Sequence, residues 1–117
     1  MAFKFENLRV WQDAVQLSTD INSVVKKFPK DEMYILSSQL MRACDSVSLN
    51  IAEGSTGQSN PEFKKFLGYS IRSGIEVVGC LYLARKRDLI DEKTFKTFYT
   101  QTETLVISIQ ALRNSIN

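Results

Sequence analysis

Apolar residues recur at alternating spacings of three and four along almost the whole chain, and this pattern constrains the fold more than any other feature. Four such segments follow one another, at about 6–28, 30–54, 60–87 and 91–116. This spacing places apolar side chains on one face of an α-helix. The chain contains only 5 Gly and 2 Pro, which is too few for the many tight turns of a β-fold. We therefore expect an all-α protein.

Helix-terminating and helix-initiating residues separate the four segments. Pro29 ends the first segment, because proline forces the preceding residue out of the helical region. The second segment runs to Gly54, where we expect a left-handed residue just after the helix C-cap. Asn60 and Pro61 are expected as the N-cap and first residue of the third helix, and Asp91 as the N-cap of the fourth. The segments are therefore four separate helices.

Helices of roughly 22–28 residues joined by short loops predict an antiparallel up-down-up-down four-helix bundle, with residues 1–117 as one domain. The third helix has a second apolar line through Ile75 and Tyr82, and the outer face of the fourth is poor in charge. This surplus apolar surface indicates a homo-oligomer, although exposed apolar residues also occur on monomers. The expected core stripes are Val10, Ala14, Leu17, Ile21, Val24 and Phe28; Met33, Leu36, Leu40, Ala43, Val47 and Ile51; Phe63, Leu67, Ser70, Gly74, Val77, Leu81 and Ala84; and Phe95, Phe98, Thr102, Leu105, Ile109, Leu112 and Ile116.

The composition argues against several classes of function. The chain has no histidine, which removes the commonest general base and metal ligand. Cys44 and Cys80 match no metal-binding spacing and lie among apolar residues, so we expect buried free thiols and a reducing, cytoplasmic setting. The sequence shows no signal-peptide pattern and no apolar run near the ~20 residues of a membrane span. A net charge of +2 does not by itself indicate nucleic acid binding.

A line of polar residues follows the second helix beside its apolar stripe. Spacings of three and four place these side chains within an arc of about 80°, and a weaker line continues on the third helix. We expect a structural seam, in which Arg42 pairs with Glu53 or Glu76 and the amides bridge helices, because an unpaired carboxylate beside a core is costly. The seam residues are Gln39, Arg42, Ser46, Asn50, Glu53, Ser73 and Glu76.

The same polar groups admit a catalytic alternative. Glu53 and Glu76 could supply acid–base chemistry or bind a metal, but the di-metal helical bundles also use histidine, which is missing here. Ser46 and Ser73 have no base near them except a glutamate. We therefore expect no catalytic residue, metal or cofactor. An enzyme would require both glutamates to open onto a pocket.

Basic residues on the third helix are candidates for nucleic acid contacts. Phosphate contacts need Lys and Arg. The face of the third helix that contains Gly68 and Gly79 also carries Lys64, Lys65, Arg72 and Lys86. Arg85 and Arg87 extend this set at the end of the helix. The helix dipole also favours cations at the C-terminal end of a helix. A solvated face or a protein contact is therefore an open alternative for these residues.

Several stretches resemble one known family. QLMRACDSVSLNIAEG and SNPEFKKFLGYSIRSGIE, together with FENLRVWQDAVQL and the FPKDE turn, are similar to the family named for proteins encoded in intervening sequences of bacterial 23S rRNA genes. The resemblance covers about 5–76, and the fourth helix matches in pattern only. It implies an antiparallel four-helix bundle that assembles into a ring, with five subunits expected, and no enzymatic activity.

The related accessory proteins of diversity-generating retroelements bind nucleic acid and a reverse transcriptase through a basic ring surface. Strongly basic members have a large cationic surface, whereas this chain carries 15 basic and 13 acidic residues. From the residues and the resemblance we expect a non-enzymatic oligomer that contacts RNA or a ribonucleoprotein through a weak basic face. The alternatives are a protein-interaction scaffold without nucleic acid and, more remotely, a carboxylate-dependent enzyme.

Overall fold

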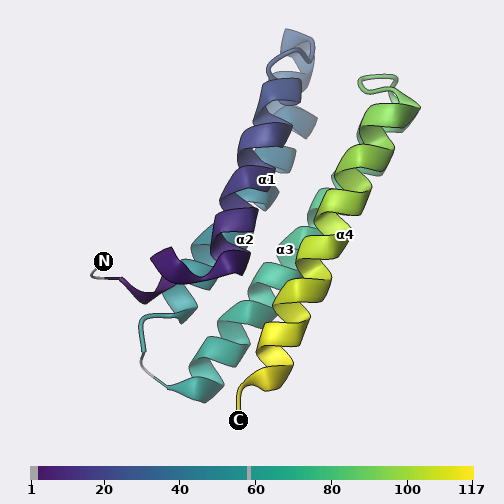
Figure 1. Cartoon of the computed structure of the whole chain (residues 1–117). Coiled ribbons are helices and arrows are strands. Elements are labelled where there is room, and N and C mark those ends of the chain that lie inside the picture. Colours follow the sequence, from purple (N-terminus) through teal and green to yellow (C-terminus); the bar gives the residue numbers. More distant parts are fainter. Residues whose placement is uncertain (1–2, 58) are drawn as a thin grey trace.

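The protein consists of four long helices. The structure, a computed structural model, describes residues 3–57 and 59–117. The helices are α1 (Arg9–Val25), α2 (Ser38–Gly54), α3 (Asn60–Lys86) and α4 (Glu92–Ser115), and the described residues contain no strand. Figure 1 shows that each helix runs opposite to the one before it. The expected all-α, up-down-up-down bundle is therefore confirmed.

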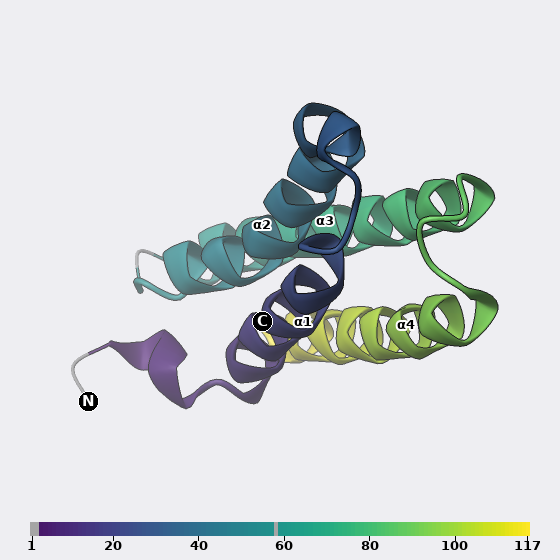
Figure 2. The same cartoon turned by 90° about the horizontal axis from the view of Figure 1, so that it is seen from above.

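The bundle is elongated, measuring 43 × 22 × 21 Å. Seen from above, α2 and α3 lie side by side, and α1 and α4 lie on the same side of that pair (Figure 2). The α2–α3 contact is the most extensive in the molecule, and the α1–α4 contact is the weakest between adjacent helices. Among the described residues, no helix is both long and apolar enough to cross a bilayer.

Most residues of the predicted apolar stripes form the core, and Val24, Phe28, Leu112 and Ile116 are only partly buried against it. Leu17, Leu40, Leu67 and Ile109 are each at most 1% exposed, and burial of such a side chain stabilises the fold by roughly 1.5–3 kcal/mol. Both cysteines are buried and free, as expected. Of the predicted stripe residues, the side chain of Met33 lies outside those that the structure describes.

The first two helices are shorter than the sequence suggested. A 3₁₀ turn, η1 (Lys4–Asn7), precedes α1, because Leu8 is extended and interrupts the helix. A 3₁₀ turn, η2 (Lys30–Glu32), and a π-helical turn, η3 (Met33–Ser37), precede α2. Leu36 and Ser37 of this π turn are both buried.

Two of the expected helix ends need correction. Ser59, not Asn60, is the N-cap of α3, because Ser59 is extended and its Oγ accepts a 3.2 Å hydrogen bond from the backbone N–H of Glu62. Gly54 is the last residue of α2 rather than a left-handed residue beyond it, and the positive φ belongs to Gly57, at 88°. Asp91 is the N-cap of α4, as expected.

Candidate functional site

The polar seam forms hydrogen bonds between α2 and α3. The hydroxyl oxygens of Ser46 and Ser73 lie 2.8 Å apart across the two helices. The side-chain amide of Asn50 donates to the backbone oxygen and to the hydroxyl of Ser46, both at 2.9 Å. These three side chains are half-buried. The inner part of the line is therefore a polar link between the two most closely packed helices.

The outer part of the line lacks the ion pair that we expected. Gln39 Nε2 lies 3.4 Å from Glu76 Oε2, but within the described residues Arg42 makes no ion pair with either glutamate. Arg42 and Glu53 are 11 positions apart, which is about 16 Å along a helix and beyond the reach of an arginine side chain. The predicted pairing with Glu53 was therefore wrong in its geometry.

Glu53 and Glu76 open onto a groove of about 620 Å³ between α2 and α3. Three carboxylates and one guanidinium line this groove, so its charge is negative, and the exposed side chain of Leu49 lies between them. The described residues include no cluster of potential metal ligands. The groove therefore meets the spatial condition that the catalytic alternative required, although the chain has no histidine to act as a base or metal ligand there. Its lining is Arg42, Ala43, Asp45, Ser46, Leu49, Asn50, Glu53 and Glu76.

The cysteines near this groove are unsuited to nucleophilic chemistry. Burial, with smaller contributions from the nearby Asp45 and Cys80, raises the pKa of the Cys44 thiol to about 12. Burial, with a smaller contribution from Glu76, also raises the pKa of the Cys80 thiol. Since the thiolate is the nucleophile, both side chains remain protonated and inert near neutral pH.

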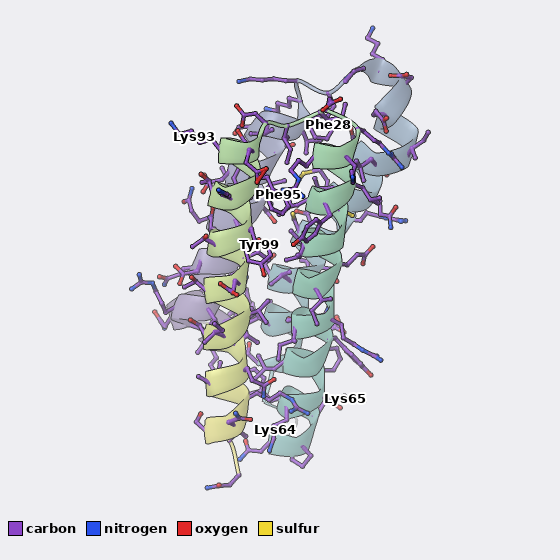
Figure 3. The ribbon with its side chains drawn as sticks, turned by 90° about the vertical axis from the view of Figure 1, so that its right-hand side faces the viewer. Phe28, Lys64, Lys65, Lys93, Phe95 and Tyr99 are labelled. Carbon is purple, nitrogen blue, oxygen red and sulfur yellow. The ribbon has the colours of Figure 1, made fainter. Side chains whose placement is uncertain are left out.

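The six basic residues predicted on α3 do not form one surface. Lys64 and Lys65 lie near the start of α3, at the opposite end of the bundle from Lys93 and Phe95 (Figure 3). About 30 Å of helix separates Lys65 from Lys86. Lys65 Nζ lies 5.8 Å from the centre of the Phe66 ring. The third helix therefore presents two small groups of cations, with Arg72 exposed between them.

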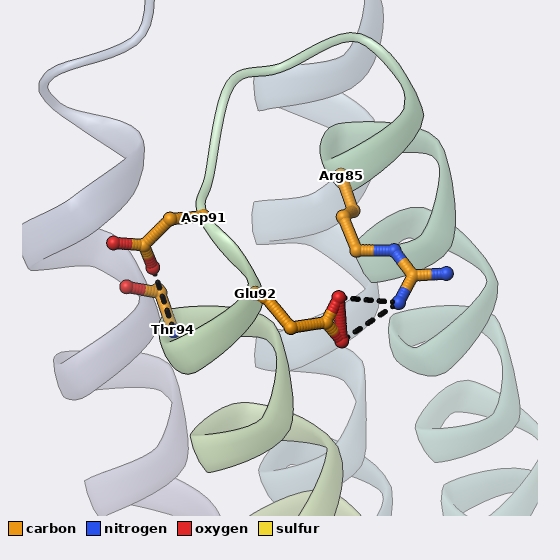
Figure 4. Close-up of polar contacts among 4 residues, drawn as sticks. All are labelled: Arg85, Asp91, Glu92 and Thr94. Atoms are coloured by element: carbon orange, nitrogen blue, oxygen red, sulfur yellow. Dashed lines mark hydrogen bonds and ion pairs between the residues drawn. The ribbon is translucent and has the colours of Figure 1, made fainter.

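Two of the six predicted basic residues, Arg85 and Arg87, form ion pairs within the fold. Arg85 Nη1 donates to both carboxylate oxygens of Glu92, at 2.9 and 3.0 Å (Figure 4), and its guanidinium lies 4.4 Å from the Phe95 ring centre. Arg87 Nη1 forms a 3.1 Å ion pair with Glu32. These arginines hold the α3–α4 turn and the turn between α1 and α2.

The Arg87–Glu32 pair shows that these two turns meet at one end of the bundle. This end, which we call the basic end, carries five further lysines that the sequence analysis overlooked: Lys26, Lys27, Lys30, Lys93 and Lys96. The sequence could have predicted this cluster of lysines, because in an up-down-up-down bundle the first and third helices end on the same side. The basic end comprises Lys26, Lys27, Lys30, Arg85, Lys86, Arg87, Lys93 and Lys96.

Positive charge is concentrated at the basic end. Residues 26–32 and 85–96 hold eight basic and five acidic residues, which gives a charge of +3. The remainder holds seven basic and eight acidic residues, which gives −1, and the two add to the net +2 of the chain. Within the described part of the chain, none of the six lysines at this end lies within 4.0 Å of a carboxylate.

The comparisons with known proteins agree with this architecture. A family model described as 23S rRNA-intervening sequence protein matches residues 6–111. The crystal structure of a protein of unknown function from the S23 ribosomal protein family of Bacteroides thetaiotaomicron is similar in fold, with a TM-score of 0.83 and 17% sequence identity. The similarity covers 90% of this chain and 95% of that chain. No curated protein sequence matches the chain significantly.

Proposed function

The chain belongs to the family of 23S rRNA-intervening sequence proteins, and we propose that it is a non-enzymatic module that self-associates and binds RNA through its basic end. The observation that supports RNA binding is the charge distribution. The basic end carries +3 while the rest of the chain carries −1. Lysines without carboxylate partners are the groups that contact phosphates and supply most of the affinity of such complexes.

The helix dipole accounts for some of these lysines but not for all of them. Lys86 lies in the last turn of α3, where the negative end of the dipole favours a cation. Lys93 and Lys96 lie near the start of α4, where the dipole disfavours cations. The helix dipole therefore does not account for Lys93 and Lys96, and their charges are consistent with an anionic partner.

Self-association has separate support on the side of the bundle between α3 and α4. Ile75 and Ile107 are 61% and 63% exposed, and both line an apolar groove of about 250 Å³. Glu103 is the single charged residue in the lining. A second copy of the chain would remove this surface from water, and an assembly would multiply weak phosphate contacts through avidity.

The RNA-binding proposal is tested with a charge reversal at the basic end. The double variant Lys93→Glu, Lys96→Glu is compared with Lys64→Glu, Lys65→Glu, which makes the same change near the start of α3 at the other end. Binding of a fluorescein-labelled oligouridylate is followed by anisotropy across a salt series. We expect the first variant to weaken binding about tenfold or more and to lower the salt slope by about two.

The control is expected to bind within about twofold of the unaltered protein. If both double variants bind the oligouridylate as tightly as the parent, the RNA-binding proposal is refuted. It is also refuted if the two double variants lose the same amount of affinity. Self-association is tested independently by the mass of the Ile107→Asp variant in solution. A charge placed at this exposed position has little effect on a monomer but disrupts an apolar contact. An unchanged mass would exclude this face as the contact.

A further inference from the structure

Three aromatic rings cluster beside the basic end on the α3–α4 side of the bundle. The Tyr82 ring centre lies 4.8 Å from that of Phe95 and 6.4 Å from that of Tyr99, both in edge-to-face arrangements. The Phe95 and Tyr99 ring centres are 5.8 Å apart. Figure 3 shows Phe95 and Tyr99 on α4 just below Lys93. Aromatic surface and free cations therefore occupy the same region.

The three rings differ in exposure. Phe95 is 6% exposed and Tyr99 is half-buried, whereas Tyr82 is 45% exposed. Phe95 and Tyr99 are therefore parts of the fold. Tyr82 leaves nearly half of its surface open to solvent at the edge of the cluster and, unlike Tyr99, does not line the groove proposed for self-association, so that contact need not cover it.

Arg85 holds Tyr82 in place. Its guanidinium lies 5.5 Å from the Tyr82 ring centre and 4.4 Å from the Phe95 ring centre, while Glu92 holds the same group by two hydrogen bonds. A ring fixed in this way loses little conformational freedom when a ligand packs on it. Tyr82 is therefore an ordered aromatic surface.

The neighbouring cations suit a phosphate backbone. Lys86 follows Tyr82 by four residues, so both lie on one face of α3. Lys96 directly follows Phe95 in the sequence, and Lys93 precedes it by two residues. All three lysines are exposed. A polyanion held by these lysines would place its bases next to the open part of Tyr82.

We propose that Tyr82 stacks with an unpaired base, so that the RNA bound at the basic end is single-stranded. This inference rests on the proposed function. Every base has a flat π-face, and aromatic side chains beside Lys and Arg bind single strands without sequence preference in this way. Bases within a duplex are already stacked on one another and do not reach a side chain.

A second exposed tyrosine on the same helix provides the matched control. Tyr69 is 40% exposed and packs edge-to-face on Phe66, with ring centres 5.4 Å apart, near the opposite end of the bundle. Its environment lacks the arginine held by Glu92 and the lysines from two helices. Tyr69→Leu therefore removes a similar amount of exposed aromatic surface without affecting the basic end.

The test compares a labelled oligouridylate with a labelled RNA duplex. Tyr82→Leu keeps apolar contact with Phe95 but removes the flat ring, and Tyr82→Phe keeps the ring. We expect Tyr82→Leu to weaken binding of the single strand about tenfold, with an unchanged salt slope and unchanged binding of the duplex. Tyr82→Phe and Tyr69→Leu are expected to stay within about twofold of the parent.

The outcomes separate the two proposals. If Tyr82→Leu weakens both probes equally, weakens neither, or changes the mass of the assembly, stacking by Tyr82 is refuted. If the Lys93→Glu, Lys96→Glu variant leaves both probes bound as before, the RNA-binding function itself fails. Loss of both probes in the lysine variant, with loss of the single strand alone in the tyrosine variant, supports both.

Discussion

Gly54 and Phe66 approach so closely that any side chain at position 54 would force α2 and α3 to shift. A Cβ atom built on Gly54 would lie 2.5 Å from the Cβ of Phe66 and 3.2 Å from a ring carbon of Phe63. The close approach of α3 to the last turn of α2 therefore requires glycine. The backbone conformation at position 54 does not itself require glycine, because its φ is not positive.

Replacement of Gly54 by alanine is expected to lower the free energy of unfolding by about 1–3 kcal/mol, because the backbones of two helices must move apart. Gly79→Ala is the matched variant, since a Cβ there meets nothing within 4 Å. In the interior of α3 it is expected to raise stability by about 0.5–1 kcal/mol through helix propensity. Urea unfolding of both variants measures the difference, and equal effects would contradict this explanation.

The buried hydroxyls of Ser70 and Thr102 predict opposite effects. Ser70 Oγ donates a 2.8 Å hydrogen bond to the backbone oxygen of Val47 on α2, so Ser70→Ala is expected to cost about 0.5–1.5 kcal/mol. Thr102 Oγ1 is buried without a partner among the described residues, so Thr102→Val is expected to be neutral or stabilising. The denaturant midpoints of the two variants measure these changes in stability. A loss of stability in Thr102→Val would reveal a hydrogen bond to the Thr102 hydroxyl.

The N-cap of α4 predicts a specific sensitivity to acid. The side-chain hydroxyl of Thr94 and its backbone N–H lower the pKa of the Asp91 carboxyl. The backbone N–H donates to Asp91 Oδ1 at 2.8 Å (Figure 4). A depressed pKa in the folded state contributes stability above the unfolded value, near 4, and this contribution is lost as pH falls through the folded value. Asp91→Asn keeps an acceptor but no charge, so its Tm is expected to fall less than that of the parent between about pH 5 and pH 2.

Asp45→Asn serves as the control for this pH series, because Asp45 is exposed and caps no helix. Its Tm profile is expected to follow that of the parent. A parallel decline for Asp91→Asn and the parent would show that the cap charge does not contribute to the acid transition.

Both thiols are expected to resist modification in the folded protein. Because burial raises its pKa to about 12, the Cys44 thiol stays protonated at pH 8, and its sulfur is also inaccessible. Reaction with a chromogenic disulfide reagent should therefore be slow in buffer and fast in guanidinium chloride. Rapid reaction of one equivalent without denaturant would mean that the packing of α2 on α3 opens readily.

The sequence was sufficient for the features that depend on one helix at a time. The alternating spacing identified the buried positions, such as Leu17 and Leu67, because a repeat near 3.6 places them on one face whatever the neighbouring helix is. It also identified Asp91 as a cap, because capping is a local interaction.

The features that depend on two distant segments were predicted less well. The clash that a side chain at position 54 would make is with Phe66, twelve residues later. The face predicted for Lys65 and Lys86 considers only the angle around the helix and ignores their separation of about 30 Å along it. Lys26 and Lys93 lie at the same end of the bundle only because two turns, far apart in sequence, close that end.

The uneven charge along the 43 Å bundle gives the molecule a permanent electric dipole directed along its length. Such a dipole exerts a torque on the protein in the field of a polyanion before any contact forms. The protein would therefore arrive end-on, with its turns rather than its helix flanks leading. This orientation accelerates encounter at low ionic strength, and the acceleration disappears once counterions screen the field over about 10 Å.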